Sequence, residues 1–237
     1  MRQFAIGDIH GCVKTLDALL TRLELTHEDQ LIFLGDYIDR GPDSKGVIQC
    51  LQNLAKHYPT KCLLGNHEDF FLTVHQSDDR QLWKQWLQLG GYETLTSFKI
   101  AKCRQFPTDI IEFLESLPVL VETSSHVFVH GGLSSWRLDP VKHSTRDEML
   151  WSRDAIHDRQ VIGGRQLVVG HTPSSVETIL QSLEAPTAFI DGGCVYSQSH
   201  HEFGFLAAYE TTQKQLTIQP NLDFCEKVVV SSARHSV

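Results

Sequence analysis

The sequence has no excess of positive charge. Among its 237 residues, 29 acidic residues outnumber 21 basic ones, the net charge is −8, and no run of lysine or arginine occurs. Binding of nucleic acid or of an anionic membrane depends on clustered positive charge, so neither partner is expected. An anionic substrate would therefore need a local positive site within an acidic protein.

Long apolar runs and paired cysteines are also absent. No stretch approaches the roughly 18 consecutive apolar residues that span a bilayer, and we expect no signal peptide. The six cysteines contain no C-x-x-C pair, which favours free thiols in a reducing compartment over a disulfide framework or a cysteine zinc site. Since linkers and repeats are missing too, the sequence predicts one domain over residues 1–237, in the cytoplasm.

Six short segments share one pattern. Each has three or four apolar residues, followed by a glycine beside one or two polar residues that can bind metals. Such apolar runs predict strands buried on both faces, and leucines at helical spacing over 13–25 and 45–57 predict the alternating order of a parallel α/β sheet. The segments are FAIGDIH (4–10), LIFLGDY (31–37), KCLLGNH (61–67), HVFVHGG (126–132), QLVVGHT (166–172) and TAFIDGG (187–193).

Two parts of the chain depart from this alternation. Residues 67–98 show an amphipathic helical pattern that is interrupted by LGGYETL, and 108–117 predicts another helix. Together they predict a helical, cap-like segment over about 67–118, whose aromatic side chains we expect in the core. Near the end, FGFLAAYE and QLTIQP flank a polar turn, which predicts an antiparallel hairpin.

Side chains that can bind metals recur where the predicted strands end. The carboxyl ends of strands are the usual place of sites in α/β sheets, so we expect these side chains to lie together. Carboxylates, amides and imidazoles at one edge would repel one another or stay unsatisfied without a cation. Oxygen and imidazole donors suit a divalent ion such as Mn, Fe or Zn, and so many donors suit two ions better than one. The residues are Asp8, His10, Asp36, Asn66, His67, His130 and His171.

The motifs GDIHG, GDYIDRG, GNHE, VHGG and VGHTP follow in this order between residues 7 and 173. Together they resemble the calcineurin-like metallophosphoesterases, specifically the phosphoprotein phosphatase family in its short bacterial and phage form. The resemblance implies an α/β fold: a metallophosphoesterase-type β-sandwich flanked by helices, with a dinuclear metal site at the carboxyl ends of the strands. It also implies a metal-dependent phosphomonoesterase that acts on phosphoserine or phosphothreonine, with phosphotyrosine as a further option, in a phosphoprotein or phosphopeptide.

The resemblance implies a ligand set for two divalent ions. Mn²⁺ is the preferred ion, with Fe and Zn as alternatives, and Asp36 bridges the two ions. Two metals about 3.5 Å apart can share a water and convert it to a hydroxide aimed in line at phosphorus. The implied ligands are Asp8, His10 and Asp36 for the first ion, and Asp36, Asn66, His130 and His171 for the second.

The same motifs imply roles around the metals. Arg40 and Arg153 are expected to bind the phosphate oxygens through charge-assisted hydrogen bonds. His67 is expected to be the general acid for the leaving oxygen, kept protonated and oriented by Asp39. These arginines and the metals would supply the local positive site that the acidic composition requires.

Two other functions stay open. Leu64 stands where many protein phosphatases have an arginine, and LLGNH resembles the symmetrical dinucleoside tetraphosphatases, which would make a nucleotide or another small phosphate ester the substrate. Glu68 and Asp39 favour the protein phosphatases instead. A non-catalytic protein-binding scaffold of the same fold is a third hypothesis, although every implied ligand is present.

Several residues stay without an assigned role at this point. Asp191 could support the site from behind the ligands, and His200 and His201 could line its mouth or simply be exposed. His126 lies at the start of its predicted strand, and we expect it to be solvated.

Overall fold

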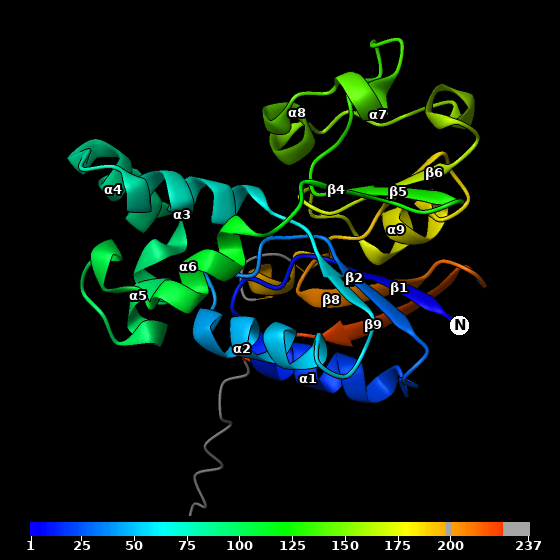
Figure 1. Ribbon diagram of the computed structural model, residues 1–237. Helices are drawn as coiled ribbons and strands as arrows, with labels where there is room; N and C mark the ends of the chain where they lie inside the picture. Colours follow the sequence, from blue (N-terminus) through cyan, green and yellow to red (C-terminus); the bar gives the residue numbers. More distant parts are fainter. Residues whose placement is uncertain (198–200, 225–237) are drawn as a thin grey trace, which may run out of the picture.

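The computed structural model describes residues 1–197 and 201–224, and within these residues the strands form two sheets packed face to face (Figure 1). One sheet has the order β3-β2-β1-β8-β9 and the other the order β4-β5-β6-β7. The strands are β1 (Gln3–Ile6), β2 (Gln30–Phe33), β3 (Thr60–Cys62), β4 (Leu120–Glu122), β5 (His126–Val129), β6 (Gln166–Val169), β7 (Thr187–Phe189), β8 (Phe205–Glu210) and β9 (Gln215–Pro220).

The pairing of the strands is mixed in both sheets. β1, β2 and β3 are parallel, while β8 runs antiparallel to β1 and forms the predicted hairpin with β9. β5, β6 and β7 are parallel, and β4 lies antiparallel on their edge. The parallel strands of each sheet therefore end at one edge, where the polar residues of the six motifs follow.

Helices cover the sandwich and extend it on one side. In Figure 1, α1 and α2 lie along one sheet, and the segment from α3 to α6 forms a separate group of helices beside the strands. The helices are α1 (Val13–Arg22), α2 (Ser44–Leu54), α3 (Asn66–Gln76), α4 (Arg80–Trp86), η1 (Leu87–Gly91), α5 (Tyr92–Phe98), η2 (Cys103–Gln105), α6 (Thr108–Glu115), α7 (Pro140–His143), α8 (Arg146–Trp151), η3 (Arg159–Ile162), α9 (Val176–Ser182) and η4 (Cys194–Tyr196).

The alternation of side chains along β1 divides the core into layers. Phe4 and Ile6 face the helices in one cluster, whereas Ala5 points between the two sheets and packs in a cluster with Phe128 and Tyr209. Because successive residues of a strand point to opposite faces, β1 contributes side chains both to the cluster under the helices and to the cluster between the two sheets. Both faces of β1 are thus covered, as its unbroken apolar run predicts.

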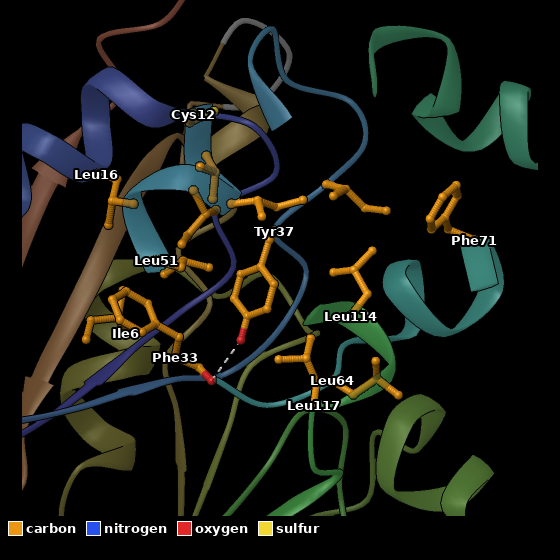
Figure 2. Packing of buried hydrophobic residues seen from close by; sticks show 14 of the residues in the cluster. Ile6, Cys12, Leu16, Phe33, Tyr37, Leu51, Leu64, Phe71, Leu114 and Leu117 are labelled. Carbon is orange, nitrogen blue, oxygen red and sulfur yellow. Dashed lines mark hydrogen bonds between the residues drawn. The ribbon is translucent and has the colours of Figure 1, made fainter. Parts of the chain in front are cut away.

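Tyr37 connects the strand ends to the group of helices α3 to α6. Its side chain is fully buried, and its hydroxyl lies 2.7 Å from the carbonyl oxygen of Leu63 and 3.2 Å from that of Phe33 (Figure 2). Leu114 of α6 and Phe71 of α3 belong to the same apolar cluster. The segment after β2 is therefore held between the sheet and these helices.

The predicted elements are confirmed in kind, with some corrections. The helical stretch 67–98 is divided into α3, α4, η1 and α5, and Gly90 at φ 110° breaks it. β4 was not predicted because it has only three residues, of which Leu120 and Val121 are partly buried and Glu122 is exposed, with no clear alternation. The expectation for His126 was wrong: it is 8% exposed, and its ring nitrogen Nδ1 lies 2.8 Å from the Ser125 hydroxyl.

Two expectations from composition can be compared with the structure. Within the described residues, the five cysteines form no disulfide; Cys12, Cys103 and Cys194 are buried, and Cys225 lies outside this part. No helix in residues 1–197 and 201–224 is both long and apolar enough to cross a bilayer.

Candidate active site

The strand ends of both sheets meet in one buried polar cluster. Asp8 and His10 follow β1, and Asp36 follows β2. The other sheet contributes the residues after β5, β6 and β7, and Asn66 begins α3. The buried members are Asp8, His10, Asp36, Asn66, His67, His130 and Asp191, each no more than 5% exposed.

The backbone of this cluster is held in an unusual conformation. Eight non-glycine residues of the described part have positive φ, and five of them belong to the predicted site. Such conformations cost about 1–3 kcal/mol each and persist only where the surrounding structure enforces them. Their concentration at one place indicates a site that is built for function. The five are His10 (φ 46°), Asp36 (52°), Asp39 (69°), Arg40 (67°) and His171 (64°).

Asp36 lies between two groups of histidines. Its Oδ2 is 3.4 Å from Nε2 of His10, and its Oδ1 is 3.4 Å from Nε2 of His130. The potential ligand atoms of His10, Asp36 and His67 lie close enough together to hold one ion, and those of Asp36, His130 and His171 could hold a second. One carboxylate is therefore placed to serve two ions.

Backbone carbonyls fix the orientation of two of these imidazoles. Nδ1 of His10 lies 2.9 Å from the carbonyl oxygen of Ile38, and Nδ1 of His130 lies 2.8 Å from that of Leu34. A proton on each Nδ1 leaves Nε2 with a lone pair that is directed into the cluster. This arrangement is typical of metal-binding histidines, whose second ring nitrogen is held by a carbonyl or carboxylate.

Burial sets the charge of the cluster. It lowers the pKa of His10 and His130 below the ordinary value, and it lowers the pKa of His171 to about 4, so burial favours the neutral form of these rings. Burial, reinforced by Asp191 and Asp36, raises the pKa of Asp8 well above its usual range, and burial raises the pKa of Asp191 to about 7. Neutral imidazoles beside crowded carboxylates indicate that this site accommodates cations.

The donor set therefore fits two divalent ions. Oδ1 of Asn66 lies 2.8 Å from Nε2 of His130 and 3.0 Å from Nδ1 of His171. An amide oxygen and two imidazole nitrogens that can bind a metal therefore lie close together. Asp8 accepts hydrogen bonds from the His171 backbone N–H at 3.1 and 3.2 Å. Carboxylate, amide and imidazole donors without thiolate are compatible with Mn, Fe or Zn.

His67 differs from the other histidines of the site. Its Nδ1 lies 2.8 Å from Oδ2 of Asp39, which is fully buried. Burial by itself would lower the pKa of His67, but Asp36 and Asp39 outweigh it and raise this pKa above the ordinary value. The remaining nitrogen, Nε2, is thus presented as a potential proton donor.

Two residues of the cap-like segment position Asp39, and sequence reasoning missed both. The indole N–H of Trp86 donates to Oδ2 of Asp39 at 3.1 Å, and the Thr94 hydroxyl donates to Oδ1 at 2.8 Å. Trp86 was expected in the core, and it is fully buried. Nothing in the helical pattern of this segment indicates that its N–H also meets a carboxylate.

Glu68 holds the turn that carries Asp36. Its carboxylate accepts hydrogen bonds from the backbone N–H groups of Asp36, Tyr37, Ile38 and Gly65 at 2.8–3.1 Å. A buried carboxylate with four backbone donors is a rigid support. In the sequence, Glu68 only helped to distinguish protein phosphatases from dinucleoside tetraphosphatases. In the structure, its carboxylate holds the backbone that positions Asp36.

A cleft of about 220 Å³ opens onto the cluster. Arg40 and Arg153 both line it, together with Asn66, His67 and His171. Nη1 of Arg40 lies 2.8 Å from Nε2 of His10, and Arg153 is exposed at the rim. The two guanidinium groups thus face the same space as the predicted ligands.

Apolar side chains form the rest of the rim, and none of them was singled out from the sequence. Leu89, Trp151, Pro173 and Tyr196 line the cleft. Leu64, by contrast, is 1% exposed and belongs to the core, so this position supplies no charge to the cleft.

The residues that the sequence left unassigned lie in different places. Asp191 is buried next to the predicted ligand Asp8 and accepts a hydrogen bond from the Gly193 N–H at 2.7 Å. His201 is exposed in a turn, and His200 lies outside the described residues.

Comparison with known proteins identifies the family. The model of the calcineurin-like phosphoesterases matches residues 1–214. The chain is 31% identical to serine/threonine-protein phosphatase 1 of Salmonella typhimurium over 179 residues, which cover 72% of this chain and 78% of that protein. It is also 30% identical to a symmetrical bis(5'-nucleosyl)-tetraphosphatase of Vibrio parahaemolyticus over 149 residues, 62% of this chain and 51% of that protein.

The solved structures agree on the fold. A crystal structure provisionally assigned as a diadenosine tetraphosphatase superposes with a TM-score of 0.69 at 24% identity, covering 93% of each chain. At this identity the likeness supports the α/β architecture and says nothing about substrate.

Proposed function

Because this chain belongs to the calcineurin-like phosphoesterase family, we propose that it is a metal-dependent phosphomonoesterase that removes phosphate from phosphoserine and phosphothreonine in proteins. Phosphoesterase activity follows from the family, while the choice of substrate is the proposal.

We propose that the cluster binds two divalent ions, with Mn²⁺ preferred. When bound, the two ions supply the Lewis acidity that turns a water into the nucleophile and offsets charge on the phosphate oxygens. Asp36 is the shared ligand in this proposal, since its two oxygens face different histidines. The proposed ligands are Asp8, His10 and Asp36 for one ion, and Asp36, Asn66, His130 and His171 for the other.

Arg40 and Arg153 are proposed to bind the phosphate. They line the same cleft as Asp36 and His67, and guanidinium groups form paired, charge-assisted hydrogen bonds to phosphate oxygens. Holding those oxygens from two directions stabilises the charge that they carry in the transition state. The exposed position of Arg153 would let it engage when substrate enters.

His67 is proposed to donate a proton to the leaving oxygen, and Asp39 to hold it in place. The observation that carries the proposed function is this dyad, with Nδ1 of His67 2.8 Å from a fully buried carboxylate. Nδ1 is bound to Asp39, so only Nε2 is directed toward substrate. General acid catalysis by such a group contributes about 10²- to 10⁴-fold.

The leaving group decides between the two enzymatic functions. A serine or threonine alkoxide is a strong base and cannot depart at neutral pH without a proton. The nucleotide released from a dinucleoside tetraphosphate is a far weaker base and needs little protonation. A buried, carboxylate-supported acid is therefore most useful for phosphoserine and phosphothreonine, which favours the protein phosphatase.

A symmetrical dinucleoside tetraphosphatase is the second candidate. It is favoured by the tetraphosphatase relative and by Leu64, which is buried and stands where many protein phosphatases have a phosphate-binding arginine. The test is a comparison of rates on phosphoserine, phosphothreonine and phosphotyrosine peptides and on diadenosine tetraphosphate.

We expect the phosphoserine and phosphothreonine peptides to be the better substrates, and His67→Asn to reduce their kcat by about 10²- to 10⁴-fold. The same variant should reduce p-nitrophenyl phosphate hydrolysis much less, because that leaving group departs without a proton. Metal content must be measured alongside, since His67 lies close to His10 and Asp36. Preferential hydrolysis of the tetraphosphate, or loss of bound metal from His67→Asn, would overturn the assignment.

A further inference from the structure

A second cavity lies beside the catalytic cleft. It has a volume of about 420 Å³, against about 220 Å³ for the cleft itself. Arg40, Leu89 and Tyr196 line both spaces, so the two are neighbours across these three side chains. A substrate whose phosphate lies in the cleft would reach the second cavity with its adjoining part.

One wall of this cavity is fixed to the proposed phosphate-binding arginine. The backbone N–H of Arg40 donates to the carbonyl of Gly90 at 3.1 Å. Gly90 has φ 110°, and a Cβ at this position would lie 2.3 Å from the Arg40 nitrogen. Only glycine allows the two segments to approach so closely, so the cavity keeps a constant position relative to Arg40.

The lining of the cavity combines aromatic faces with one carboxylate. Tyr92, Tyr196 and Phe224 line it, and Tyr92 is 66% exposed. Glu93 is the acidic residue of the lining, and its side chain is half-buried. Within the described part of the chain, this side chain forms no ion pair. Aromatic rings beside a carboxylate are well suited to a lysine or arginine side chain, which can stack and pair at once.

We infer that this cavity is a subsite for a basic residue that lies near the phosphorylated residue of a protein substrate, and that Glu93 selects it. The inference rests on the proposed protein phosphatase function. Arg40 would bind the phosphate on one side of the shared wall, and Glu93 would bind the cationic side chain on the other.

The charge of the cavity argues against a nucleotide in the same place. A dinucleoside tetraphosphate that extended past Arg40 would carry its remaining phosphates toward Glu93, where like charges repel. Arg40 is the cationic residue of the lining, and it already faces the cleft. A basic side chain is attracted by Glu93 instead; Arg40 repels it, but the Arg40 guanidinium lies at the catalytic cluster, with Nη1 2.8 Å from Nε2 of His10.

The experiment uses a set of phosphoserine peptides that carry a single arginine at each position from −3 to +3, with alanine elsewhere. The ratio of kcat/KM between each arginine peptide and the all-alanine peptide is measured for the parent, Glu93→Gln, Glu93→Lys and Glu112→Gln. Because each ratio is taken within one variant, general damage to the enzyme cancels. Glu112→Gln is the matched control, since it removes an exposed charge of α6 that does not line the cavity.

We expect one arginine position to raise kcat/KM about three- to ten-fold in the parent, mainly through KM, as for a partly exposed ion pair. Glu93→Gln should abolish this preference, Glu112→Gln should retain it, and Glu93→Lys should reverse it, so that the arginine peptide becomes a poorer substrate than the all-alanine peptide. Hydrolysis of the peptides without a preference, or a preference that survives in Glu93→Gln, would overturn the subsite and leave the proposed function standing. If diadenosine tetraphosphate is cleaved and no peptide is, the proposed function itself fails.

Discussion

Trp86→Phe tests whether the cap-like segment controls the proton donor. The substitution keeps an aromatic ring in the core and removes the indole N–H that donates to Asp39 at 3.1 Å. Asp39 retains its contacts with His67 and Thr94, both at 2.8 Å. The carboxylate should therefore stay in place but lose one of the three groups that fix its orientation.

The structure allows the size of the effect to be bounded. A hydrogen bond to a charged group contributes about 1.5–3 kcal/mol, and its partner here is a buried carboxylate, so the free energy of unfolding should fall by roughly this amount. The catalytic effect must be smaller than removal of His67 itself, which costs about 10²- to 10⁴-fold. We expect a loss of about three- to thirty-fold in kcat on a phosphoserine peptide, and little change on p-nitrophenyl phosphate.

The assay is kcat on both esters at saturating manganese, together with the urea midpoint of unfolding. Trp83→Phe is the matched control, since Trp83 lies in the same helix with its ring 5.5 Å from that of Trp86, and within the described residues its indole N–H donates no hydrogen bond. Thr94→Val should reproduce the leaving-group bias, because it removes the other donor to Asp39. Equal losses on both esters, or an equal bias in Trp83→Phe, would refute the reasoning.

Four further predictions concern the metals, the arginines and stability. Prolonged chelation should abolish hydrolysis of p-nitrophenyl phosphate, and manganese should restore it better than magnesium, which accepts imidazole ligands poorly; full activity of metal-stripped enzyme would contradict the two-ion proposal. Arg153→Ala should weaken phosphate binding and turnover while both metals stay bound, and an unchanged rate on every phosphate ester would exclude its proposed role. Gly90→Ala should reduce turnover at least as much as Arg153→Ala, because its Cβ would lie 2.3 Å from the Arg40 nitrogen and displace that residue; the measurement is kcat/KM with circular dichroism as a check of folding. Hydrogen bonds from Arg2 hold the pKa of Asp29 well below its usual range, so Asp29 stabilises the fold fully above about pH 4 and this contribution is lost progressively at lower pH; urea midpoints of the parent and Asp29→Asn should differ at pH 7, and the difference should begin to narrow below about pH 4.

Much of the fold and of the candidate site could be predicted because both depend on local patterns. Apolar runs such as Phe4–Ile6 specify strands that are buried on both faces, and the polar residues that follow them necessarily lie at one edge when strands are parallel. The same reasoning gathered Asp36 and the histidines at one edge, and the resemblance of the motifs to the phosphoesterases implied that Asp36 lies between two groups of ligands. Reasoning from position failed for His126, because its place at the start of a strand indicated exposure, whereas the side chain is only 8% exposed.

The residues that were missed act through contacts between distant parts of the chain. Trp86 and Thr94 reach Asp39 across 47 and 55 residues, and Glu68 binds backbone groups about 30 residues away. No local pattern records such a partner. A buried tryptophan is recognisable as core from its spacing, but the direction of its N–H depends on how the helix packs.

The sequence by itself determined the chemical groups and the edge at which they gather, because periodicity and motif order are local properties of the chain. Only the tertiary structure decided their geometry. The left-handed backbone of His10, Asp36, Asp39, Arg40 and His171 is costly in isolation and is enforced by packing and hydrogen bonds from elsewhere. The cavity between Glu93 and Tyr196 likewise forms from segments about a hundred residues apart, and its shape exists only once both sheets and the group of helices α3 to α6 have assembled.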